Sequence, residues 1–266
     1  MVVISPEFAK LVAITNESKE KLCKLIVERE SLVFHVCKNL KIDYMLKVGS
    51  LEYNLMKIQN EVLRNKRLVE LYNQNKNELE AANDEEEKNK IINKINKRVE
   101  IEFLEFNKIE KKQLEDIDIA IDLSMTDLLE KEELDELNEI YMKLQLTLNP
   151  ALKLKSKIQD SELFTTIEKL YKKGNIKKLR KIAEEYEAEP VVDEIDNLEK
   201  LKSRYDILIK ENQKVITKIK TTFPYSQKVM LEDENLYRRK KDSLNEKIFS
   251  VTEENENILK ELKKMI

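Results

Sequence analysis

The sequence predicts an all-α protein in which long antiparallel, coiled-coil-like helical arms surround a small helical unit. Glycine and proline are scarce, with 2 and 4 residues among 266, so the chain lacks the turns that β-sheets require. Charged residues make up 38% of the chain and hydrophobic residues 41%, a composition typical of long helices. Apolar residues also recur every three or four positions along most of the chain, which is the helical period.

The N-terminal segment is predicted to be a helix that begins at Ser5–Pro6 and reaches about Asn39. Serine favours the N-cap position, and proline is tolerated in the first turn, where its missing N–H is not needed. Beyond this helix, apolar seams run from Leu51 to Leu79 and from Ile92 to Ile109, with a polar turn at residues 82–85 between them. Two long seams joined by a short turn favour an antiparallel hairpin.

The central segment is predicted to hold three shorter helices. An apolar face runs from Leu134 to Leu144, and Asn149–Pro150 ends that helix because the residue before a proline avoids the helical conformation. A second helix starts near Asp160 and carries apolar residues as far as Tyr171. Gly174–Asn175 stops it, since both residue types tolerate the left-handed conformation at a helix C-terminus, and a third helix follows.

The C-terminal segment is predicted to form a second antiparallel hairpin after a short linker. One seam runs from Leu198 to Ile219, the chain turns at Phe223–Pro224, and a returning seam runs from Leu244 to Met265. A reversal at Pro224 would place Asn212 roughly opposite Tyr237. The predicted domains are a long-helix and hairpin region, a central helical unit and a C-terminal hairpin, at residues 1–126, 127–188 and 194–266.

Charge, apolar runs and cysteine content indicate the compartment in which we expect the protein. The net charge of −3, with basic and acidic residues interleaved, indicates no partner by itself. No apolar run reaches the roughly 18 residues of a membrane span, and the N-terminus lacks the basic start and long apolar core of a signal peptide. Cys23 and Cys37 are isolated thiols, which is typical of a reducing compartment. We therefore expect a cytoplasmic protein that does not bind membranes.

The chain lacks the sequence signatures of catalysis. His35 is the sole histidine, and with Cys37 it falls short of a metal site because no second Cys or His pair lies nearby. We expect it to be a partly buried helical residue. Gly49 and Gly174 stand alone, so no glycine-rich phosphate loop exists. We therefore expect no enzyme, no metal, no cofactor and no small-molecule substrate.

One central stretch carries a family resemblance. Tyr141-Met-Lys-Leu-Gln-Leu-Thr-Leu-Asn-Pro150, with the turn near Gly174 after it, resembles the J-domain of DnaJ-type co-chaperones. It is most similar to the form found in bacterial, Firmicutes-type J-domain proteins flanked by long helices. At the corresponding positions that family has Lys-Leu-His-Pro-Asp-Leu-Asn-Pro. The segments from Met45 to Leu55 and from Phe223 to Leu236 resemble the arms of the same family. Gln145, Leu146 and Thr147 occupy the His-Pro-Asp positions, so the chain resembles a degenerate member.

The resemblance implies both a fold and a lost activity. In J-domains the His-Pro-Asp loop contacts the partner chaperone and is required to stimulate its ATPase, and the preceding helix supplies basic residues. Here Leu146 cannot fix the backbone as proline does, and Thr147 carries no charge. In J-domains those basic residues meet an acidic surface on the chaperone. Here residues 127–139 hold seven acidic residues and one lysine, so like charges would meet, which slows encounter and opposes binding. The resemblance therefore implies a protein that does not stimulate a DnaK-type ATPase.

The basic residues lie downstream instead. Residues 153–181 contain ten basic and three acidic residues. The plain interpretation is a solvated basic face that pairs with the acidic helix beside it, and the alternative is a surface for an acidic protein or nucleic acid. The candidate interaction surface consists of Lys169, Lys172, Lys173, Lys177, Lys178, Arg180 and Lys181.

The leading hypothesis is a non-enzymatic protein-interaction module derived from a DnaJ-type co-chaperone. Its partners would be other proteins, including a DnaK-type chaperone, or a second copy bound through the helical seams. The alternatives are a structural coiled-coil scaffold or homodimer and, less favoured, a nucleic-acid-binding protein that uses the region from Lys153 to Lys181.

Overall fold

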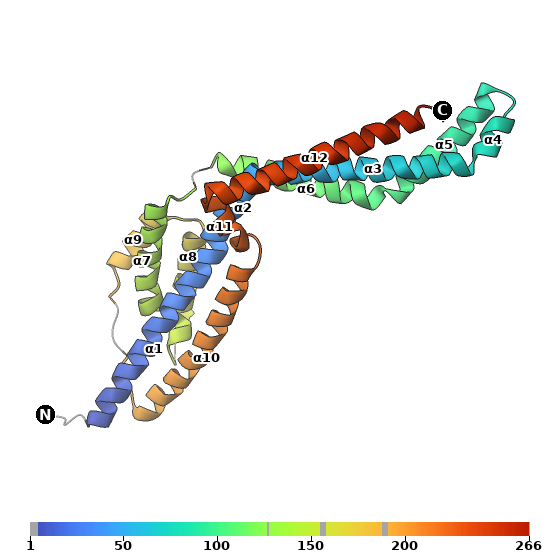
Figure 1. Cartoon of the computed structure of the whole chain (residues 1–266). Helices are drawn as coiled ribbons and strands as arrows, with labels where there is room; N and C mark the ends of the chain where they lie inside the picture. The colour runs from blue at the N-terminus through green and yellow to red at the C-terminus, as the bar shows by residue number, and fades with distance from the viewer. Residues whose placement is uncertain (1–4, 127, 155–157, 188–190, 266) are drawn as a thin grey trace. The chain divides into compact units, whose positions relative to one another are not determined.

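The computed structural model describes residues 5–126, 128–154, 158–187 and 191–265. The predicted all-α class is confirmed, because these residues form helices and connecting turns and no strand (Figure 1). The chain divides into two compact units, each built from two separate pieces. Unit 1 comprises Met1–Lys41 and Asp127–Gln227, and unit 2 comprises Ile42–Thr126 and Lys228–Ile266.

The N-terminal helix is longer than the sequence pattern predicts. Helical residues continue without a break from Pro6 to Gln74, so the helix does not end near Asn39. The run consists of α1, η1, α2, η2 and α3, at Pro6–Ser31, Leu32–Val36, Cys37–Tyr44, Met45–Gly49 and Ser50–Gln74. Both η segments are π-helical turns, which accommodate an extra residue without ending a helix. Gly49 has ordinary helical angles, φ −56° and ψ −38°, and therefore does not stop the chain.

Together with short connecting segments, unit 1 consists of α1, η1 and four further helices. These are α7, α8, α9 and α10, at Lys131–Leu148, Ile158–Lys172, Ile176–Glu184 and Ile195–Thr221. α10 lies beside α1 (Figure 1) and runs parallel to it, because the backbone N–H of Val191 donates to Asn16 and Lys220 forms an ion pair with Glu28 at 2.6 Å. One buried cluster joins α7, α8 and α9, and a second joins α1 to α10 and Leu152.

Unit 2 contains the hairpin that the first two seams predict. The short helix α4 (Lys76–Ala81) leads to the returning helices α5 (Glu85–Glu102) and α6 (Leu104–Ser124). Arg67 of α3 donates to Glu102 at 2.7 Å, whereas Gly49 lies beside Ile117, so the return is antiparallel. α11 (Lys228–Glu232) and α12 (Glu234–Leu262) complete the unit.

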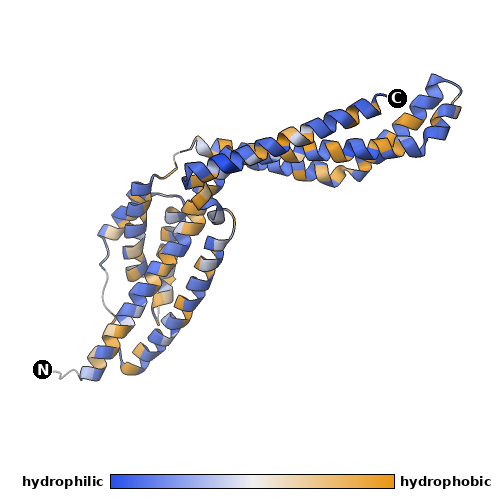
Figure 2. Cartoon of the chain, in the orientation of Figure 1, coloured by the Kyte–Doolittle hydropathy of each residue, from blue (hydrophilic) through white to orange (hydrophobic). Residues whose placement is uncertain are grey.

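The predicted pairing of the two C-terminal seams differs from the observed packing. α10 packs on α1, whereas α12 packs along α3 (Figure 1). Asn212 accepts a hydrogen bond from Arg29 at 2.9 Å instead of facing Tyr237, whose ring lies 6.0 Å from the Lys47 ammonium group. Hydrophilic and hydrophobic residues alternate along α10 and α12 (Figure 2). Such a seam fixes which face is buried but does not specify the helix that covers it.

The turn between α8 and α9 depends on a glycine. Gly174 has φ +67°, and a Cβ atom added there would lie 2.9 Å from Leu129 Cδ1. We expect Gly174→Ala to lower the free energy of unfolding by about 1–2 kcal/mol, because the left-handed conformation strains an L side chain. Urea denaturation measures the change. Gly49→Ala is the matched control, since Gly49 is helical and faces only the flexible Met45 side chain at close range; equal losses in both variants would contradict the conformational explanation.

Candidate functional site

α7 carries the positions that the resemblance singled out. Glu130 is the N-cap of the helix, and its backbone N–H donates to the Glu133 side chain at 3.0 Å. The acidic residues of the first turn suit the positive end of the helix dipole. Its buried side includes Leu137, Tyr141 and Leu144, none of which is exposed. The helix ends at Leu148, directly before Asn149–Pro150, as predicted.

The three positions aligned with His-Pro-Asp lie in the last turn of α7 and not in a loop. Gln145 is 1% exposed, and its Oε1 accepts a hydrogen bond from Asn149 Nδ2 at 2.6 Å. Leu146 packs against the cluster that joins α1 and α10, and the Thr147 hydroxyl donates to the Lys143 carbonyl at 2.7 Å. Without a proline at position 146 the helix continues to Leu148, whereas the His-Pro-Asp tripeptide of J-domains lies in a loop.

The segment Leu148-Asn149-Pro150, called here the Leu-Asn-Pro frame, has a structural role in unit 1. Asn149 is 6% exposed, and its Oδ1 accepts from the backbone N–H of Ala151 at 2.8 Å. This bond caps the short 3-10 helix η3, Pro150–Leu152. The hydroxyl of Tyr205 on α10 then donates to the Leu152 carbonyl at 2.5 Å. The frame therefore ties the end of α7 to α10.

A buried carboxylate, that of Glu30, lies beside α7 and was missed in the sequence. The Tyr141 hydroxyl donates to Glu30 Oε2 at 2.5 Å, and Arg29 Nη2 donates to Glu30 Oε1 at 3.0 Å. Arg29 also donates to Asn212, so α1, α7 and α10 meet in one network. Burial, and then the Glu30 carboxylate, raise the pKa of Tyr141 far above its ordinary range. The only available signal was that Glu30 continues the apolar spacing of Leu22 and Ile26.

A second chain of hydrogen bonds runs beside the first. The Tyr171 hydroxyl donates to Asn138 Oδ1 at 2.7 Å, and Asn138 Nδ2 donates to Ser31 Oγ at 3.2 Å. The Tyr141 and Tyr171 rings stack with centroids 3.8 Å apart, and His35 meets Tyr171 edge-on at 5.0 Å. These residues connect α1 and its π-helical turn to α7 and α8. The arrangement fixes the packing of unit 1, and Glu30, Tyr141 and Tyr171 are all buried within it.

His35 is buried, as expected from the sequence, with 7% of its surface exposed. Burial lowers its pKa below the ordinary value of 6.5, a hydrogen bond to the Tyr171 backbone carbonyl opposes this shift, and the Lys38 ammonium reinforces it. Its Nε2 has no hydrogen-bond partner among the described residues. The neutral imidazole is therefore the form that the folded unit accommodates.

Stability is expected to depend on pH through His35. The unfolded chain binds the proton first, near pH 6.5, so the contribution of His35 is complete above that value and is lost as the pH falls toward the lowered folded pKa. The slope reaches up to about 1.4 kcal/mol per pH unit. Urea denaturation between pH 8 and about 5 measures it.

His35→Gln is the control, because an amide does not titrate in this range. Burial, and then the Glu30 carboxylate, raise the pKa of Glu168, which adds stability on acidification and so acts in the opposite sense. Glu168 is present in both proteins, so the difference between them isolates His35. Identical slopes in wild type and variant would contradict the assignment.

The candidate basic surface lies on the end of α8 and on α9, and all seven of its side chains are exposed. Arg180 forms an ion pair with Glu136 of α7, and the Lys172 ammonium lies 4.7 Å from the centroid of the Phe34 ring. The other five lysines form no ion pair with any residue that the structure describes. Pairing with the acidic helix α7 therefore involves one of the seven basic side chains, Arg180. Of the remaining basic residues in that stretch, Lys155 and Lys157 lie outside the described ranges.

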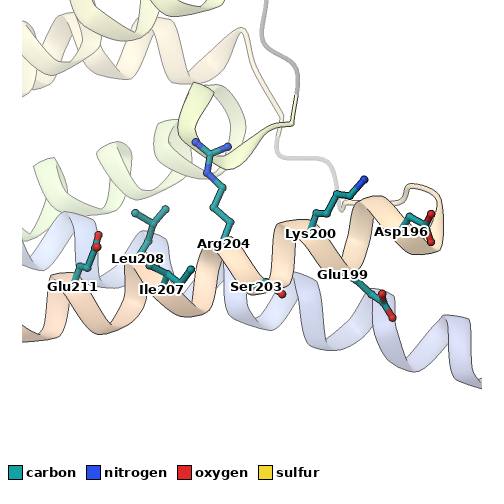
Figure 3. A pocket seen from close by; sticks show the side chains of 8 residues that line it. All are labelled: Asp196, Glu199, Lys200, Ser203, Arg204, Ile207, Leu208 and Glu211. Carbon is teal, nitrogen blue, oxygen red and sulfur yellow. The ribbon is translucent and has the colours of Figure 1, made fainter.

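An open hollow lies along α10, with a volume of about 720 Å³. All eight lining residues come from this one helix (Figure 3): Asp196, Glu199, Lys200, Ser203, Arg204, Ile207, Leu208 and Glu211. Arg204 extends away from α10, and its Nη1 lies 3.4 Å from the Lys153 carbonyl. Three acidic and two basic side chains line the hollow, so its charges nearly balance.

Within residues 5–126, 128–154, 158–187 and 191–265, no group of three His, Cys, Asp or Glu side chains is arranged to hold a metal ion. Over the same residues, no helix combines the length and the apolar character needed to cross a bilayer.

Comparison with known proteins adds no relative. The chain matches no protein-family model, no curated protein and no solved structure.

Proposed function

We propose that this protein is a non-enzymatic protein-interaction module, derived from a DnaJ-type co-chaperone, that does not stimulate a DnaK-type ATPase. One observation carries the proposal: the positions aligned with His-Pro-Asp lie inside α7, where Gln145 is 1% exposed and bound to Asn149. A J-domain presents this tripeptide to its partner from a loop. Here the corresponding residues are used for packing within unit 1.

The charge of α7 supports the same proposal. Glu132, Glu133, Asp135 and Glu139 are exposed on this helix, and Lys131 and Lys143 are its only basic residues. The corresponding surface of a J-domain is basic and meets an acidic surface on the chaperone. An acidic helix would repel that surface, which lowers both the rate of encounter and the affinity.

Steady-state ATP hydrolysis by a purified DnaK-type chaperone tests the proposal. We expect the turnover rate to be unchanged by saturating amounts of this protein, whereas a co-chaperone with an intact His-Pro-Asp loop accelerates it. Acceleration by the wild-type chain would overturn the proposal. A parallel binding titration separates a protein that docks on the chaperone without activating it from one whose partners lie elsewhere.

The second candidate is a structural scaffold or homodimer, which exposed apolar side chains of unit 2 favour. Ile101, Val229 and Phe249 are 69%, 68% and 66% exposed, and such residues gain from burial against another chain. Sedimentation at increasing concentration discriminates, because a monomer at every concentration argues against a scaffold built by self-association.

A further inference from the structure

We propose that unit 1 associates with a second copy of this chain through two oppositely charged faces. The acidic face consists of Glu132, Asp135 and Glu139 on α7, and the basic face consists of Lys177, Lys178 and Lys181 on α9. The inference builds on the proposed function, because it gives the interaction module a partner and the surfaces that bind it.

The acidic face is a single exposed stripe. Residues three and seven positions apart lie on one side of a helix, so Glu132, Asp135 and Glu139 project together. All three are exposed, and none forms an ion pair with another described residue. Glu136, at the border of the stripe, is already paired with Arg180 of α9. The stripe therefore keeps its negative charge available to another molecule.

The basic face is likewise uncompensated within its own helix. Leu179 and Ala183 are buried, so Lys177, Lys178 and Lys181 project from the opposite side of α9 into solvent. Lys177 and Lys178 lie in the first turn, which contains no acidic residue. A helix N-terminus carries partial positive charge and is stabilised by acidic side chains. The two lysines instead add positive charge there and are repelled by it. An external carboxylate face relieves that repulsion.

Charge complementarity identifies the partner as another copy. Glu132 to Glu139 spans roughly 10 Å along α7 and Lys177 to Lys181 roughly 6 Å along α9, at 1.5 Å per residue. The faces therefore have opposite signs, and the basic face is short enough to lie within the length of the acidic one. Across the α7–α9 border of one copy, Arg180 and Glu136 form the one ion pair among the described residues. Two different faces meeting make a heterologous contact, which leaves one face free at each end and permits chains longer than a dimer.

Sedimentation velocity of the full chain tests the wild type. We expect the average mass to rise with protein concentration at about 0.05 M salt and to return to that of a monomer at about 0.5 M, because salt screens exposed charges. Association that persists unchanged at high salt would overturn the proposal and indicate an apolar interface instead.

A charge exchange identifies the faces. Asp135→Lys with Glu139→Lys reverses the acidic face, and Lys177→Glu with Lys181→Glu reverses the basic face, with the same spacing in each variant. We expect each variant alone to associate at least about tenfold more weakly than wild type, because like charges then meet. An equal mixture of the two is expected to recover association, since each reversed face finds a complementary one on the other variant. Circular dichroism confirms that both variants remain helical.

Three further results would overturn the inference. They are a wild type that stays monomeric at low salt, variants that associate as well as wild type, and a mixture that does not recover. A monomeric wild type that binds a DNA oligonucleotide through the basic face would assign that face to nucleic acid. None of these results alters ATP turnover by a DnaK-type chaperone, so the proposed function is tested separately.

Discussion

Leu146→Pro, the central change in restoring His-Pro-Asp, is expected to lower the free energy of unfolding by about 3 kcal/mol or more. A proline inside a helix removes one backbone hydrogen bond and its ring clashes with the carbonyl four residues earlier. Position 146 lies within α7, which continues to Leu148. The substitution also removes a side chain that packs against the cluster between α1 and α10. The variant that restores all three residues, Gln145→His with Leu146→Pro and Thr147→Asp, is therefore expected to disrupt the end of α7 and not to gain co-chaperone activity.

Urea denaturation of Leu146→Pro beside Leu146→Ala separates the two causes. Alanine keeps the backbone N–H and loses only the packing of a partly buried leucine, which costs roughly 1–2 kcal/mol. The backbone contribution is the difference between the variants. If both unfold at the same urea concentration, position 146 is not held in a helix, and the assignment of the tripeptide positions to α7 would be wrong.

Tyr141→Phe is expected to lower the free energy of unfolding by about 1.5–3 kcal/mol, the range for hydrogen bonds to charged groups. The variant keeps the ring that stacks on Tyr171 and removes the hydroxyl that donates to Glu30. Glu30 is 8% exposed, so water cannot fully replace the lost donor. The remaining bond from Arg29 supports only the other carboxylate oxygen.

Two further variants make this test specific. Tyr186→Phe removes a hydroxyl that makes no hydrogen bond with any described residue, and we expect a change within about 0.5 kcal/mol. In a Glu30→Gln background the effect of Tyr141→Phe should shrink, because an uncharged amide costs less to leave unpaired. A loss of the same size in that background would show that the hydroxyl acts through another residue.

The sequence was sufficient for the features that local chemistry controls. The helical period and the scarcity of glycine and proline gave the all-α class. Asn149–Pro150 and Gly174 gave the ends of α7 and α8, because both act on the adjacent backbone alone. The first hairpin also followed from the sequence, because a short polar turn makes the two helices that it joins antiparallel neighbours.

Other features required contacts between residues far apart in the chain. The run from Leu32 to Gly49 holds no residue that stops a helix, yet only the structure showed that π-helical turns keep it continuous. Gln145 could have been exposed on a loop or buried on a helix, because a glutamine is compatible with both. Glu30 looked like an ordinary surface residue until Tyr141 and Arg29 were placed beside it.

By itself, the sequence determined which stretches are helical, where several of them end, and which side of each is apolar. The tertiary structure decided which helix covers each apolar side: α1 covers α10, and α3 covers α12. It also decided that the positions aligned with His-Pro-Asp serve packing. The physical reason is that helix formation depends on neighbours within about four residues, whereas the partner of an apolar seam is selected by packing across the whole unit.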